Sequence, residues 1–167
     1  AATGTVQTTR GNILIDAADA VALGVVNANS DATGGVGDVT VVARAGAITD
    51  ANAGTLNVTA DGLELRAALA IATDGDRLET AVNNLEASGG TGGIFVANTG
   101  ALTIGGVTSG LTGLLATGSD IKVTASSPMT VDEDVVNSGG GNILLAALGS
   151  AATDDLTVNA DITASGG

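Results

Sequence analysis

Acidic side chains are the residues of this sequence whose types and spacing best support chemistry. The densest run is Asp132, Glu133 and Asp134, and a second group is formed by Asp74 and Asp76 on either side of one glycine. Ca²⁺ is bound by about six to eight oxygen ligands, which carboxylates supply. These five residues are therefore candidate Ca²⁺ ligands. The alternative is that both groups are solvated corners, because the second group lacks the downstream acidic ligands of a helix-loop-helix calcium site.

Most other catalytic chemistry is excluded by residue types that the sequence lacks. It contains no His and no Cys, which excludes His-based nucleophilic triads, imidazole acid–base catalysis and thiolate or imidazole metal sites. Lys122 is the only lysine, and it falls at an outward, mid-strand position that does not favour Ser–Lys chemistry. We identify no catalytic or cofactor-binding residue, and the sequence predicts a protein that is not an enzyme.

Polysaccharide lyases and hydrolases are a separate case, because some are built on solenoids of strands. They need a groove with paired acids, a cation and aromatic platforms for sugar rings. The four arginines are scattered at positions 10, 44, 66 and 77, and Phe95 is the single aromatic residue. Phe95 is better interpreted as a core or stacking residue, and fold analogy alone cannot supply an activity.

Charge and composition limit the partners and the kind of core. The net charge of −13 argues against nucleic acid and against an anionic bilayer. No apolar run approaches the ~18–20 residues of a membrane span, so membrane insertion is not expected. With 26 glycines and almost no aromatic residues, the core must consist of Ile, Leu, Val and Ala, which suits a thin, repetitive interior.

A repeat explains this composition. Alternating apolar positions recur in several short segments, each preceded by a glycine or a small polar residue, and their first apolar residues are Ile13, Val39, Leu63, Ile94, Ile121 and Ile143. In sequence number these anchors lie 26, 24, 31, 27 and 22 apart, within the range typical of solenoid repeats. A second strand-like segment follows most of them at an almost constant interval, as at Val21, Ile48, Ile71, Leu102 and Met129.

The repeat predicts the fold class. Alternating apolar residues bounded by Gly, Asn, Asp and Ser indicate short strands. Three such strands per unit describe one coil of an all-β, right-handed parallel β-helix (a β-solenoid), with about six coils of about 26 residues. Residues 1–167 are expected to form a single β-solenoid segment, which we interpret as an excerpt of a longer repeat chain or filament.

One segment is ambiguous at this level. Leu78, Val82 and Leu85 recur at intervals of four and three in the sequence, which fit one face of a helix and equally fit two short strands that meet at a corner. We favour strands, because the surrounding segments are strand-like and one or two helical turns are marginal alone.

The sequence resembles the repeats of filamentous-haemagglutinin-like bacterial surface proteins. The run from Ala97 to Gly106 is similar to their NTGALTIGG strand and turn, and the runs from Gly139 to Leu145 and from Leu156 to Gly167 are similar to their other repeats. The resemblance covers residues 10–167. It implies a right-handed β-helical stalk or fibre that is exported from a bacterium and serves adhesion, matrix or surface structure.

These observations lead to a functional expectation. The chain is expected to be an extracellular or cell-surface structural module that is stabilised by coil-on-coil stacking. It lacks a polar, Pro-rich or helical cap, so its first and last coils are expected to stack on further coils of the same chain or of a neighbouring copy. The alternatives are an adhesin that binds a carbohydrate, a host receptor or a matrix ligand, and a β-helical polysaccharide lyase or hydrolase.

Overall fold

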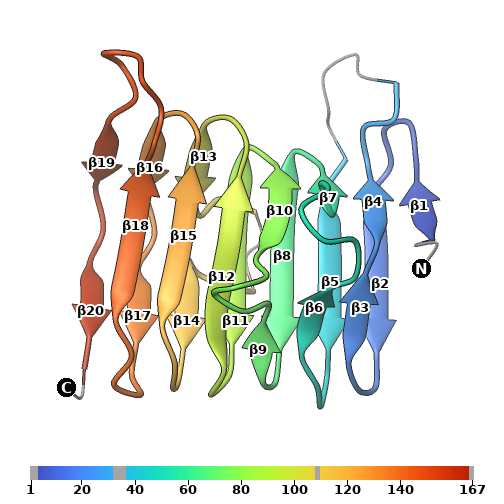
Figure 1. The fold of residues 1–167 in the computed structure, drawn as a ribbon, viewed down its shortest axis with the longest axis horizontal. Coiled ribbons are helices and arrows are strands. Elements are labelled where there is room, and N and C mark those ends of the chain that lie inside the picture. Colours follow the sequence, from blue (N-terminus) through green and yellow to red (C-terminus); the bar gives the residue numbers. More distant parts are fainter. Residues whose placement is uncertain (1–3, 32–36, 108–109, 166–167) are drawn as a thin grey trace.

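The protein is a parallel β-solenoid. The computed structural model describes residues 4–31, 37–107 and 110–165, which form no helix. About six turns of roughly 24 residues stack along one long axis, and the strands lie across that axis in two facing layers (Figure 1). The predicted all-β parallel β-helix is therefore confirmed.

Each layer is a sheet of ten strands, and every pair of neighbouring strands is parallel. Sheet A contains β1 (Thr5–Gln7), β3 (Val21–Leu23), β4 (Val25–Asn27), β6 (Ile48–Asp50), β7 (Val58–Thr59), β9 (Ala70–Ile71), β10 (Leu78–Ala81), β12 (Gly93–Asn98), β15 (Ile121–Ala125) and β18 (Ile143–Ala147). Sheet B contains β2 (Ile13–Ala17), β5 (Val39–Ala43), β8 (Gly62–Ala67), β11 (Asn84–Gly89), β13 (Leu102–Ile104), β14 (Leu114–Ala116), β16 (Met129–Val131), β17 (Val135–Asn137), β19 (Leu156–Val158) and β20 (Ile162–Ala164).

Most turns combine one long strand with a pair of short strands on the opposite sheet. The long strand lies in sheet B in the first half of the chain, as in β2, β5 and β8, and in sheet A in the second half, as in β12, β15 and β18. The change occurs in one turn, where β11 and β12 are both long. We call this turn the switch turn.

The switch turn corrects the single series of anchors that the sequence intervals suggested. Leu63 pairs with Leu85 in sheet B, whereas Ile94 pairs with Ile71 in sheet A. The longest interval, from Leu63 to Ile94, therefore joins two positions that do not stack. Sequence spacing does not distinguish the sheets, because the first strand of a unit looks the same in either one.

The ambiguous segment is resolved as two strands. Leu78 begins β10 in sheet A and Leu85 lies in β11 in sheet B, with the corner between them at Val82 and Asn83. The two apolar side chains Leu78 and Leu85 are fully buried. The expectation of two short strands meeting at a corner is confirmed.

The core consists of apolar columns that run along the solenoid axis. In sheet B one inward column passes through every layer, including the switch turn: Ile13, Val39, Leu63, Leu85, Ile104, Val131 and Val158. Its middle members are completely buried, whereas Val158 is 48% exposed. Each layer thus removes apolar surface from water mainly by covering the layers above and below it.

Candidate functional site

The outer face of sheet B carries two neighbouring carboxylates that are withdrawn from solvent. Glu64 and Glu86 are directly paired residues of β8 and β11, and they are only 5% and 0% exposed. An outward position is normally solvated, so this burial requires a cover. Val107, which follows β13, contributes to this cover, since its backbone N–H donates to Glu86 Oε1 at 2.7 Å.

A cation and a hydroxyl satisfy the first of these carboxylates. The Arg66 Nε–H donates to Glu64 Oε1, and the Thr40 hydroxyl lies 3.5 Å from Glu64 Oε2. A buried charge is tolerated only when it is paired and hydrogen-bonded. We therefore interpret Glu86 as an anchor that holds Val107 on the sheet, and Glu64 as a buried charge that Arg66 neutralises.

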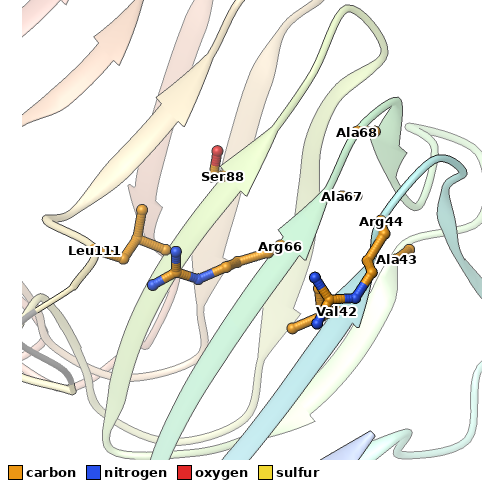
Figure 2. A pocket seen from close by; sticks show the side chains of 8 residues that line it. All are labelled: Val42, Ala43, Arg44, Arg66, Ala67, Ala68, Ser88 and Leu111. Carbon is orange, nitrogen blue, oxygen red and sulfur yellow. The ribbon is translucent and has the colours of Figure 1, made fainter. Parts of the chain in front are cut away.

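A shallow hollow lies next to this pair. Its volume is about 310 Å³, and it is lined by Arg66 of β8 and by Arg44, which directly follows β5, together with Val42, Ser88 and Leu111 (Figure 2). The two guanidinium groups are already ion-paired, because Arg44 donates to Asp16 at 2.8 and 2.5 Å and Arg66 to Glu64. The structure thus brings together two arginines that belong to different coils in the sequence.

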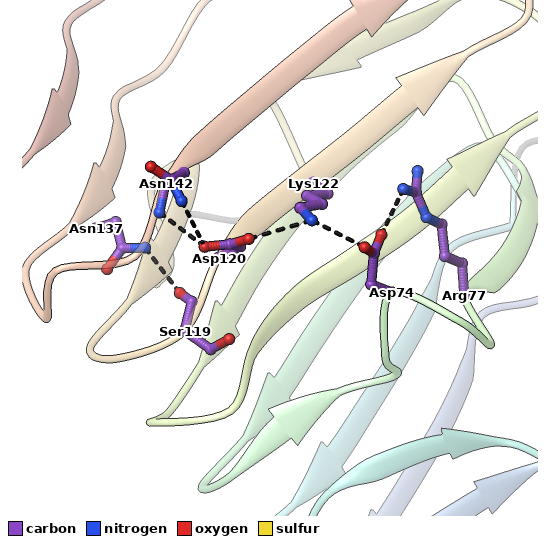
Figure 3. Close-up of polar contacts among 7 residues, drawn as sticks. All are labelled: Asp74, Arg77, Ser119, Asp120, Lys122, Asn137 and Asn142. Carbon is purple, nitrogen blue, oxygen red and sulfur yellow. Dashed lines mark hydrogen bonds and ion pairs between the residues drawn. The ribbon is translucent and has the colours of Figure 1, made fainter.

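The outer face of sheet A carries a chain of ion pairs. Lys122 Nζ lies 2.9 Å from Asp74 Oδ2 and 3.2 Å from Asp120 Oδ2, and Arg77 lies 2.7 Å from Asp74 Oδ1 (Figure 3). These contacts lower the pKa of Asp74, through its hydrogen bonds with Lys122 and Arg77. The outward, mid-strand position expected for Lys122 is confirmed, and its amine is occupied by two carboxylates.

The candidate Ca²⁺ ligands are separated by the fold. Glu133 accepts hydrogen bonds from the backbone N–H groups of Gly106 and Gly113 at 3.2 and 2.7 Å, while Asp132 accepts from the Asn159 amide and Asp134 from the Asp161 N–H. These carboxylates join neighbouring layers. Asp74 faces Lys122, and the exposed Asp76 belongs to a different group of acids.

That second group consists of Asp50, Asp76 and Glu79. Asp50 Oδ1 accepts from the Asn52 N–H at 2.7 Å and from the Asn57 amide at 2.6 Å, but Asp50 Oδ2 and Glu79 Oε2 are buried without a hydrogen-bond partner among the described residues. Burial and the neighbouring charges of Asp50 and Asp76 raise the pKa of Glu79. For Asp50, burial raises the pKa, but the hydrogen bonds from Asn52 and Asn57 outweigh it and the pKa is lowered.

Metal binding stays a prediction. Within residues 4–31, 37–107 and 110–165, no group of three or more His, Cys, Asp or Glu side chains is arranged to hold a metal ion. The same residues contain no helix long and apolar enough to cross a membrane. No family model, curated protein or solved structure gives a significant match to this chain.

Glu79→Gln is expected to stabilise the protein at neutral pH by about 0.5–1 kcal/mol, because it removes a partly buried negative charge that the neighbouring charges of Asp50 and Asp76 disfavour. A raised folded-state pKa means that protonation of Glu79 favours the folded state. The stabilisation that protonated Glu79 provides is present at low pH and is lost as the pH rises through the folded-state pKa of Glu79. Urea unfolding at pH 7 and near pH 3.5 measures the difference in unfolding free energy between the variant and the parent chain at each pH.

The advantage of the Gln variant should therefore disappear at acid pH. Asp155→Asn, at an exposed position, removes one negative charge elsewhere and should leave the free energy of unfolding unchanged at both pH values. An equal gain from both variants would mean that overall charge, rather than the local group of acids, limits stability.

Proposed function

We propose that this chain is a structural module of a bacterial extracellular or cell-surface fibre, such as an adhesin stalk, a matrix component or a filament subunit. The observation that carries the proposal is the apolar surface that the outermost described layers of the solenoid leave exposed. At the C-terminal end Leu156, Val158 and Ile162 are 41%, 48% and 42% exposed, although Met129, Val131 and Val135, their partners in the preceding layer, are completely buried.

The N-terminal layer also exposes apolar side chains. Val6 in β1 is 47% exposed, Ile13 and Ile15 in β2 are only partly buried, and the described residues leave one edge of both strands without a neighbouring strand. Unpaired edges with apolar side chains favour pairing with further strands. The repeats similar to those of filamentous-haemagglutinin-like surface proteins give independent support for a fibre.

A direct test is sedimentation velocity of the purified chain over a range of concentrations. We expect reversible association that becomes stronger with concentration. Val158→Asp places a charge where the next layer would lie, so this variant should stay monomeric with unchanged circular dichroism. Asp155→Asn, at an exposed position close to the same end, should associate like the parent chain. A parent chain that remains monomeric at the highest concentration would overturn the proposal.

Adhesive binding of an acidic carbohydrate or a receptor is the second candidate. The hollow beside Arg44 and Arg66 favours it, since this hollow concentrates two of the five basic residues of a strongly acidic chain. Both arginines are ion-paired and the hollow has no aromatic platform, so we rank it second. Binding of a uronate-containing glycan that is lost in Arg66→Gln would reverse this ranking.

A further inference from the structure

The two end surfaces have defined positions in the winding of the solenoid. The chain crosses to the other sheet after each long strand and after each pair of short strands, and the final pair, β19 and β20, lies in sheet B. The next strand along the winding therefore belongs in sheet A, against the bare edge of β18. The first described strand, β1, is itself a sheet A strand, and β2 follows in sheet B. The N-terminal end thus begins on the sheet where the C-terminal end requires the next strand.

The registers determine which residues would meet. In sheet A the inward column through Val6 continues through Val26, Val58, Thr80, Asn98, Ala125 and Ala147. A strand added in the position of β1 would place Val6 on Ala147. In sheet B the same reasoning places Ile13 on Val158 and Ile15 on Ile162.

Each of these contacts would bury exposed apolar surface. Val6, Val158 and Ile162 are 47%, 48% and 42% exposed, and Ile13 and Ile15 are partly buried. Their counterparts in the interior layers, such as Val131 and Val135, are completely buried in the same columns. Apolar burial favours association by roughly 25 cal/mol per Å² of surface removed from water.

The middle of the molecule already contains a junction of the required type. A new β2 would have to pair with two short strands, β19 and β20. In the switch turn the long strand β11 pairs with the two short strands β13 and β14, through Asn84 with Thr103 and Ala87 with Leu114. One long strand can therefore pair with two short strands while the inward columns continue without interruption.

We propose that a second copy of this chain stacks on the C-terminal coil without a half-turn about the solenoid axis, with its β1 on β18 and its β2 on β19 and β20. The inference rests on the proposed function and specifies how copies join. In the alternative arrangement, the second copy is rotated by a half-turn about the solenoid axis. This half-turn arrangement would place β2 of the second copy on β18 and its β4 on β20. Because β1 is the strand that pairs with β4, β1 of one copy would then occupy the place of β20 of the other.

Paired cysteines distinguish the two arrangements, since the chain has no Cys of its own. On the outer face of sheet B, Asp16 and Thr163 belong to one column, which runs through Val42, Arg66, Ser88, Leu115 and Val136. Within one copy they are six strand spacings, or about 29 Å, apart. Between stacked copies they would be direct neighbours, close enough for a disulfide or a short bifunctional thiol reagent.

A chain that carries Asp16→Cys and Thr163→Cys should therefore form a ladder of covalent dimers, trimers and longer species at concentrations where the parent chain associates. The matched control carries Asp16→Cys and Ala146→Cys, which would be neighbours only in the half-turn arrangement, and it should remain uncrosslinked. Circular dichroism and melting temperature confirm that both variants fold.

The remaining outcomes separate this inference from the proposed function. A ladder from the control pair alone, or association of the parent chain without crosslinks in either variant, would overturn the stacking arrangement and leave the fibre proposal standing. A parent chain that shows no association at any concentration would overturn both.

Discussion

Leu85→Ala is expected to lower the free energy of unfolding by about 2–5 kcal/mol, a large share of the roughly 5–15 kcal/mol that holds a domain folded. Leu85 is completely buried in β11 and lies between Leu63 and Ile104 in its column. Truncating it leaves a cavity that rigid neighbours on both sides cannot fill. Urea denaturation at pH 7 measures the loss.

The matched control for Leu85→Ala is a truncation at the end of the same column. Val158→Ala, studied in dilute monomeric protein, should cost less than about 1 kcal/mol, because the Val158 side chain is 48% exposed. If Leu85→Ala and Val158→Ala lowered the free energy of unfolding by comparable amounts, stability would not depend on coverage by layers on both sides.

Gly93→Ala is expected to destabilise the protein by at least about 2 kcal/mol, because two separate effects act at this position. Gly93 has a φ of +85°, which side chains with a Cβ rarely adopt. An added Cβ would also overlap the Asp120 carbonyl oxygen, the acceptor of the Ile94 N–H at 3.0 Å. The substitution therefore strains the corner at which β11 leads into β12.

Gly75→Ala is the control for this experiment. Gly75 has no atom within 4 Å of an added Cβ and no positive φ, so the same change of residue should alter the melting temperature little. If Gly93→Ala changed the melting temperature as little as Gly75→Ala, the switch turn would not be closely packed against the next layer.

The sequence predicts the strands well, because each strand has alternating apolar and polar residues and is bounded by turn residues. Ile121–Ala125 is a clear example: the alternate residues Ile121, Val123 and Ala125 are buried, and Lys122 and Thr124 face outward. Strand content and parallel stacking follow from such patterns and from the period. The strand pattern is local to each coil, and the period needs only the intervals between coils.

The switch of the long strand between sheets could not be predicted in this way. The long interval between Leu63 and Ile94 is compatible with a longer loop or with a change of sheet. The signal that could have distinguished them was the strand-like run from Leu85 to Ala87, which provides the missing partner for Leu63. Pairing between coils, rather than the pattern within one coil, decides the point.

The buried acids were missed for a related reason. Alternation places Glu64 and Glu86 on the outer face of a strand, where a charged residue is expected to meet water. Their burial depends on the Val107 backbone, far along the chain from Glu86, folding back over β11. A return of this kind leaves no periodic signal. The same limitation explains why the sequence did not bring Arg44 and Arg66 together or group Asp50 with Asp76 and Glu79.

The sharpest measurement of stacking between copies is electron cryomicroscopy of the associated chain. Copies that continue the winding should form filaments with a strand spacing of ~4.8 Å along the axis. One copy contributes seven layers to the Ile13–Val158 column, so the chain should repeat about every 34 Å. Particles one copy long, with β18, β19 and β20 bare at concentrations far above those of sedimentation, would show that the coils do not continue from copy to copy.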